Sequence, residues 1–292
     1  MSAKVPYVSK RRDEPRTVYP MGSLIGKKKK STIAPGQFNY AGHGPSFSET
    51  YESAQQHNRN ELTKLFQEES RATVETINDI YTVASGYIWV IYRDPYAQVS
   101  PVQDVLFPCF HKSLLSLYTS QDLTMSGLWG AARPHLRHAF ESLMIAKYCS
   151  VNPSADIFDR WIDGVEIYFG NAVLKKIASP EPGEFKLLWS LLSDWSHSTV
   201  RAGQPSLELK GTDSEAGLNF GITEVLLQCI YHLLVSHMVT PSVRYYGNRY
   251  RNDDCVELAK ARIQANFKHQ RSFLGPGSLQ LIRDYRATWT TL

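Results

Sequence analysis

The sequence lacks the motifs that define several common enzyme classes. It has four cysteines in 292 residues, and no two of them form a Cys-x-x-Cys pair. It contains no Gly-x-Ser-x-Gly nucleophile elbow, no His-Glu-x-x-His zinc helix and no Glu-x-x-His motif of di-iron proteins. A glycine-rich phosphate loop and a secretory hydrophobic segment are missing as well. The sequence therefore predicts a cytoplasmic protein with reduced cysteines, no metal and no cofactor.

A long uninterrupted hydrophobic run is also missing. The best candidate, residues 222–239, is interrupted by Glu224, Gln228, His232 and His237. Each of these side chains is costly to place in hydrocarbon, so we expect no membrane-spanning helix.

Charge is distributed unevenly along the chain. Residues 1–50 hold nine Lys or Arg against three acids, so the rest carries 23 basic against 25 acidic groups. A nearly neutral body excludes a broad positive surface for duplex nucleic acid. Residues 1–46 combine Pro, Gly, Ser and basic residues without hydrophobic periodicity, which predicts a disordered basic tail. This tail either attracts phosphates in a salt-dependent way or serves only solubility.

The remaining chain has the periodicity of helices. Ser46 and Glu49 match a capping box, and the proline-free stretch that follows predicts a long helical extension, one helix or two, over residues 47–94. We expect a helical bundle over residues 95–245 and a C-terminal helix and tail over residues 246–292. The helices expected after the extension span residues 100–120, 127–150, 153–178, 185–198, 222–239 and 254–271.

One segment breaks this pattern. Residues 206–210 and 218–220 could pair as a small β-hairpin across the turn at residues 211–213. The fold class predicted is therefore all-α: an antiparallel helical bundle with a long N-terminal helix, one small hairpin and the disordered tail.

Two charged residues stand on the apolar side of the helix expected at residues 127–150. Arg137 and Glu141, four residues apart, can pair directly, and they share a sector of the helix with Phe140 and Met144. One interpretation is a buried pair that fixes the register of neighbouring helices, and the other is a ligand or phosphate site.

The opposite side of the same helix suits solvent. It carries Ala131, His135 and Ser142, none of which is a large apolar residue. His135 and His138 alone are too few ligands for a zinc site.

The helix expected at residues 185–198 has a face of short polar side chains. Ser193, Asp194 and His197 lie there, where an ordinary exposed face would use Lys and Glu. Such a face permits close approach by a helix or a ligand, and Asp194 could orient an imidazole. The alternative is a helix end whose Ser and His cap carbonyls or meet water.

A further polar band runs along the apolar helix at residues 222–239. Glu224, Gln228, His232 and Ser236 step every four residues. If the band faces inward, it could join Arg137, Glu141 and His197 in one pocket. We favour the outward orientation, in which the band is the solvent edge of an amphipathic helix.

These residues carry a resemblance to a known class. An Arg-x-x-x-Glu helix, residues 132–148, followed by the Leu-Ser-x-x-x-His element at residues 192–197, resembles an uncharacterised bacterial all-helical family of HEPN-like character. The resemblance covers about 100 residues and implies a helical bundle. Active HEPN proteins are metal-independent ribonucleases of toxin–antitoxin and phage-defence systems.

The resemblance implies a set of catalytic residues. HEPN ribonucleases have an Arg and a His with four to six residues between them and a polar residue after the Arg. Arg133 with His138, and Arg262 with His269, have this spacing, but Pro134 and Ile263 follow the arginines. The candidate catalytic residues are Arg137, His197, Glu141, Asp194, His138 and Arg133, as acid, base and phosphate-binding groups.

Two functions remain open from the sequence. The first is RNA binding or cleavage in a bacterial stress or phage-defence response by a self-associating protein. The second is a non-catalytic interaction or assembly module, in which buried polar groups are structural and the long N-terminal helix contacts a protein partner.

Overall fold

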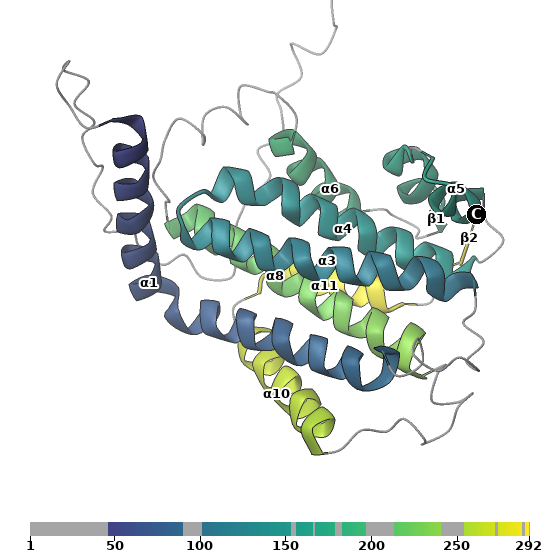
Figure 1. The fold of residues 1–292 in the computed structure, drawn as a ribbon. Coiled ribbons are helices and arrows are strands. Elements are labelled where there is room, and N and C mark those ends of the chain that lie inside the picture. The colour runs from purple at the N-terminus through teal and green to yellow at the C-terminus, as the bar shows by residue number, and fades with distance from the viewer. Residues whose placement is uncertain are drawn as a thin grey trace, which may run out of the picture.

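The computed structural model describes residues 46–89, 101–152, 156–165, 167–178, 183–196, 213–240, 254–271, 274–287 and 290–291. Nearly all regular elements in these ranges are helices, which confirms the all-α class for this part of the chain (Figure 1). The α-helices are α1 (Phe47–Ala84), α3 (Pro101–Met125), α4 (Trp129–Val151), α5 (Asp156–Ile162), α6 (Gly183–Ser196), α8 (Asp213–Leu233), α10 (Asp254–Arg271) and α11 (Pro276–Arg286). The short elements are the π-helical turns η2 (Ser85–Trp89), η3 (Gly170–Leu174) and η4 (Leu234–Val239) and the strands β1 (Ile177–Ala178) and β2 (Thr290–Thr291).

α1 begins at the predicted capping box. The Ser46 hydroxyl accepts the backbone N–H of Glu49, and the Glu49 carboxylate accepts the backbone N–H of Ser46 at 2.7 Å. The helix bends at Phe66, whose φ of −127° is not helical. The first turns of α1 project from the other helices, and the part of the helix after the bend lies along them (Figure 1).

A small apolar cluster holds the bend of α1 to the body. It joins α1 to the end of α3 and the start of α8, and its buried members are Leu62, Phe66, Met125, Ala216 and Phe220. The rings of Phe66 and Phe220 stack with centroids 5.1 Å apart. An aromatic pair of this kind contributes about 0.5–1.5 kcal/mol beyond the burial of its area, so it stabilises the bend against the body.

α3 and α4 form a helical hairpin whose connection needs a glycine. Gly127 has a φ of +77°, and a Cβ at this position would approach the side chain of Asn58 on α1 to 2.3 Å. Only glycine therefore permits both the left-handed backbone and the contact with α1.

α8 is the central helix, in contact with α1, α3, α4 and α11. Residues 216, 218–220 and 222–230 are buried, as expected of a helix that other helices cover on several sides. The predicted β-hairpin is wrong, because residues 218–220, its second arm, lie inside α8. Its first arm, residues 206–210, lies outside the described residues.

The expected helix at residues 153–178 is much shorter in the structure. α5 ends at Ile162, and the chain turns at Gly164, whose φ is +68°. The backbone N–H of Val165 then bonds the carbonyl of Arg160, a closure typical of a helix that ends in a left-handed glycine. The chain continues through η3 to β1, which pairs antiparallel with β2 near the C-terminus.

The two C-terminal helices pack on different partners. α10 lies against α1, where the Nε of Arg262 donates to Asp79 at 2.9 Å. α11 lies against α8 and α6, and the hydroxyl of its buried Tyr285 donates to the carbonyl of Leu143 on α4 at 3.0 Å.

Candidate functional site

α4 carries most of the candidate residues. Fourteen of its residues are buried, because it packs on α3, α6 and α8. Its polar groups therefore face other helices rather than bulk water, and each has to be satisfied there.

Arg133 is enclosed between α4 and α8. Only 1% of it is exposed, and its guanidinium donates to the Glu215 carboxylate and, at 3.3 Å from Nε, to Asn219 Oδ1. The guanidinium also lies over the Trp129 ring, 4.8 Å from its centroid. Burial lowers the pKa of Arg133, and Glu215 opposes that shift. This position does not suit contact with an RNA phosphate.

Asn219 connects the Arg133 pair to a third helix. Its amide donates to Thr124 Oγ1 at 3.0 Å and to the carbonyl of Trp129 at 3.1 Å. One buried amide therefore links α3, α4 and α8, and a buried network of this kind helps to define how the helices meet.

Arg137 and Glu141 form the pair predicted from their spacing. The Nε of Arg137 donates to Glu141 Oε1 at 2.8 Å, and about a fifth of each side chain is exposed. The indole N–H of Trp189 on α6 donates to the same oxygen at 3.1 Å. The pair thus ties α4 to α6 at the edge of the core.

His138 is the most exposed of the candidate groups on α4. Its ring meets His135 edge to face, with centroids 6.3 Å apart. Partial burial, and then the nearby Lys112 charge, lower the pKa of His138. Partial burial also lowers the pKa of His135.

The solvent-facing side predicted for α4 is partly wrong. Ala131 is exposed and His135 is half-buried, but Ser142 is 2% exposed. Ser142 is buried because α3 packs along α4, a contact that the helical wheel alone does not include.

The polar face predicted on α6 is only partly exposed in the structure. Ser193 is buried, whereas Asp194 is exposed. His197 lies outside the described residues, so its distance from Arg137 and Glu141 stays a prediction.

The polar band on α8 and η4 faces inward over its first half, against the orientation that we favoured. Glu224 is 4% exposed, Gln228 is fully buried, and the Gln228 amide donates to Glu224 at 2.7 Å. His232 is half-buried and Ser236 is exposed. α8 is covered on several sides, so even its polar stripe is enclosed.

The inward band reaches Lys147 on α4. Lys147 Nζ lies 3.5 Å from His232 Nε2 and 3.3 Å from His237 Nε2, and it lies 5.5 Å from the centroid of the Tyr285 ring. Burial lowers the pKa of Lys147 to about 8. Burial and the Lys147 charge lower the pKa of each histidine to about 4.

Sequence reasoning did not single out Lys147. The signal was present, because it is a lone charged residue in the apolar run from Leu143 to Cys149. A lysine in such a run is buried unless it lies near a helix end, where its long side chain can reach water.

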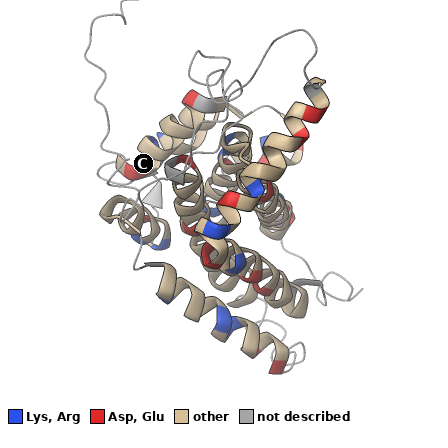
Figure 2. Cartoon of the chain, turned by 90° about the vertical axis from the view of Figure 1, so that its left-hand side faces the viewer, with Lys and Arg blue, Asp and Glu red and all other residues tan. Residues whose placement is uncertain are grey.

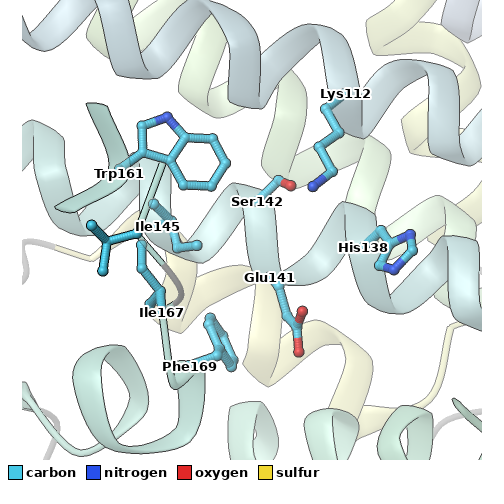
Figure 3. A pocket seen from close by; sticks show the side chains of 9 residues that line it. Lys112, His138, Glu141, Ser142, Ile145, Trp161, Ile167 and Phe169 are labelled. Atoms are coloured by element: carbon cyan, nitrogen blue, oxygen red, sulfur yellow. The ribbon is translucent and has the colours of Figure 1, made fainter. Parts of the chain in front are cut away.

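A pocket of about 170 Å³ opens beside the Arg137–Glu141 pair (Figure 3). α3 contributes Lys112, α4 contributes His138, Glu141 and Ser142 among others, and α5 contributes Trp161. Figure 3 shows the Lys112 amine and the Ser142 hydroxyl directed toward one another on one side of the pocket.

The described residues give little support to a metal site or to a reactive cysteine. Within the described ranges, no three His, Cys, Asp or Glu side chains converge as metal ligands would. Burial raises the pKa of the Cys109, Cys149 and Cys229 thiols, which disfavours their reactive thiolate forms.

One described helical segment, Glu215–Val239, is long and apolar enough to cross a membrane. In the most apolar 18-residue stretch of this segment, 78% of the residues are buried inside the protein. A core helix meets the same criteria of length and composition, so the segment is weak evidence for a membrane span.

Comparison with known proteins gives no relative: no family model, curated protein or solved structure matches this chain.

Proposed function

We propose that this protein is a non-catalytic interaction module, an antiparallel helical bundle that assembles through α1 and whose internal charges hold its helices together. The observation that carries the proposal is the state of Arg133. It is almost fully buried, and its guanidinium is engaged by Glu215 and Asn219 of α8. Arg137 is likewise engaged by Glu141. Arg133 thus joins α4 to α8, and Arg137 holds the Glu141 carboxylate that accepts the Trp189 indole of α6, so both arginines have structural roles.

The N-terminal part of α1 supports assembly. Asn58 and Leu62 are buried against the body, and Tyr51 and Ala54 continue the same face of the helix beyond it, half-buried. The projecting residues 47–57 form about three turns, and isolated helices shorter than roughly 12–15 residues are marginally stable in water. A second copy of the chain packed on this face would stabilise these turns.

Analytical ultracentrifugation of the full chain tests this proposal. We expect a dimer, and we expect the double variant Tyr51→Glu/Ala54→Arg to sediment as a monomer with unchanged helix content. Gln56→Arg lies on the exposed side of the same turns and should remain dimeric. A wild-type monomer at all accessible concentrations, or a dimer that the double variant leaves intact, would contradict assembly through α1.

RNA binding or cleavage in a cytoplasmic, HEPN-like protein is the second candidate. His138 favours it, because this histidine is exposed, next in sequence to Arg137, and shares a pocket with Lys112. An imidazole and a cation in one pocket could serve as base and phosphate-binding group. Against it, basic and acidic positions are interspersed along the helices in Figure 2, without one continuous basic stripe.

Incubation with labelled RNA in EDTA separates the two functions. The interaction module leaves RNA intact. The ribonuclease cleaves it, and loses that activity in His138→Ala or His197→Ala. Deletion of residues 1–46 identifies binding by the basic tail alone, because RNA binding is then lost while the helix content of the body is retained.

A further inference from the structure

The pocket between α3, α4 and α5 contains a cation that no internal carboxylate neutralises. Among the described residues, no Asp or Glu lies within 4.0 Å of the Lys112 amine, which instead lies 5.9 Å from the centroid of the Trp161 ring. An aromatic face attracts an ammonium group but does not cancel its charge. The pocket therefore offers one positive charge to a ligand.

Two further polar groups lie beside this cation. Ser142 is 2% exposed, and its hydroxyl makes no hydrogen bond within the described part of the chain. A buried hydroxyl of this kind is ready to donate to a ligand oxygen. The His138 ring also borders the pocket, and its neutral form carries one N–H donor.

The carboxylate of Glu141 does not reverse this preference. It faces the pocket, but its Oε1 accepts hydrogen bonds from the Arg137 guanidinium at 2.8 Å and the Trp189 indole at 3.1 Å. Arg137 thus compensates the negative charge locally, and the pocket keeps the single positive charge of Lys112.

The remaining wall is apolar and partly aromatic. It consists of Ile145, Trp161, Val165, Ile167 and Phe169. Figure 3 shows Trp161 and Ile145 on one side of the pocket, with Ile167 and Phe169 below them. Trp161 and Phe169 suit a flat hydrophobic body.

We propose that this pocket binds a small monocarboxylate with a flat apolar body, its carboxylate held by Lys112, Ser142 and His138. The volume of about 170 Å³ is below the roughly 300–1,000 Å³ of pockets for drug-sized ligands, which restricts the ligand to about one ring. The site is independent of assembly through α1, which uses a different helix.

Benzoate, benzamide and benzylamine are matched probes for this site. They share the ring and differ in charge, so titration calorimetry or ligand-observed NMR isolates the contribution of the carboxylate. We expect benzoate to bind at least about tenfold more tightly than benzamide, because the amide keeps an acceptor oxygen but lacks the negative charge that pairs with the Lys112 ammonium. Equal binding of benzoate and benzamide, or tighter binding of benzylamine, would overturn the proposal.

Variants locate the binding to this pocket. Lys112→Gln should weaken benzoate binding by about tenfold or more, and Ser142→Ala by a smaller factor. Lys186→Gln, at an exposed position of α6, is the matched control and should bind as the wild type does. If Lys112→Gln folds and binds benzoate with wild-type affinity, the assignment is wrong.

The His138 resonance provides a second readout. A carboxylate beside this ring should raise its pKa, opposite to the lowering that burial and Lys112 cause in the free protein. Benzoate should therefore shift the NMR titration of His138 to higher pH, and benzamide should not. An unchanged titration at saturating benzoate would count against contact with His138.

Discussion

Arg133 and Lys147 are both buried cations on α4, about four helical turns apart, but their surroundings differ. Arg133 meets the carboxylate of Glu215 and the amide of Asn219. Lys147 meets the imidazoles of His232 and His237.

The difference in their partners shows two ways in which a buried cation is accommodated on one helix. The guanidinium stays charged, because it is paired with a carboxylate and because arginine does not lose its proton in proteins. The ammonium of Lys147 has neutral imidazoles beside it, and its pKa is lowered to about 8. The Arg133 pair therefore stabilises the joint between α4 and α8, whereas the Lys147 charge is a net cost that the fold tolerates.

Glu215→Gln should give the largest effect. The substitution leaves the Arg133 charge buried without its carboxylate, and removing one partner of a buried ion pair costs about 3 kcal/mol or more. We expect the free energy of unfolding, measured in urea, to fall by that amount.

The matched control is Asp122→Asn. Asp122 pairs with Arg59 at 3.0 Å, but about half of each side chain is exposed. Exposed pairs contribute less than about 1 kcal/mol, so this variant should be nearly neutral. Equal losses in the two variants would remove the distinction between buried and exposed pairs.

Lys147→Met should act in the opposite direction. Methionine fills a similar volume without a charge, so we expect stabilisation by about 2 kcal/mol at pH 7. In the wild type, the unfolded chain binds more protons than the folded one between pH 8 and 10.5, so stability should rise with pH there. Urea unfolding at several pH values should show this rise in the wild type and its loss in the variant. Destabilisation by Lys147→Met would show that the amine contributes to the fold.

The two histidines predict a second pH dependence. The pKa values of His232 and His237 are about 4 in the folded protein, below the usual 6.5. As pH falls from 6.5 to 4 the unfolded chain takes up protons first, so stability should fall, by about 1–2 kcal/mol after allowance for partial exposure. His237→Gln should reduce this slope, whereas His269→Gln, at an exposed position of α10, should not. Equal slopes in both variants would contradict the assignment.

Among the changes at the joints of α4, Trp189→Phe should give the smallest effect. It removes the indole hydrogen bond to Glu141 and leaves the Arg137–Glu141 pair intact. A partly buried hydrogen bond contributes about 1 kcal/mol, and thermal unfolding should detect this loss. A loss as large as that of Glu215→Gln would place the main joint of α4 at α6 instead of α8.

Local pattern was enough to predict most of the helices and one pair. The capping box at Ser46 set the start of α1, and the spacing of Arg137 and Glu141 predicted their contact. Both features depend on residues three or four apart, which a helix brings together regardless of the rest of the fold.

The partners of Arg133 could not be predicted in this way. Glu215 and Asn219 are 82 and 86 residues away, and of the two Asn219 lies in the second arm of the expected hairpin, with Glu215 between that arm and its turn. Packing against α3 and α4 makes that segment helical, since tertiary contacts override weak local preference.

The pocket could not be predicted from the sequence, because its wall depends on the backbone conformation of one glycine. α5 ends because Gly164 adopts a positive φ, and the chain then returns past α4 with Val165 and Ile167 in the pocket wall. Periodicity favoured a continuous helix there, because glycine is tolerated within helices and does not by itself predict their end.

The most direct test of the account is the stability of the double variant Arg133→Met/Glu215→Leu, measured by urea unfolding. If the pair acts as a structural joint, removal of both charges together should restore most of the stability lost in Glu215→Gln, to within about 1 kcal/mol of the wild type. A double variant that loses at least as much stability as Glu215→Gln would contradict the account.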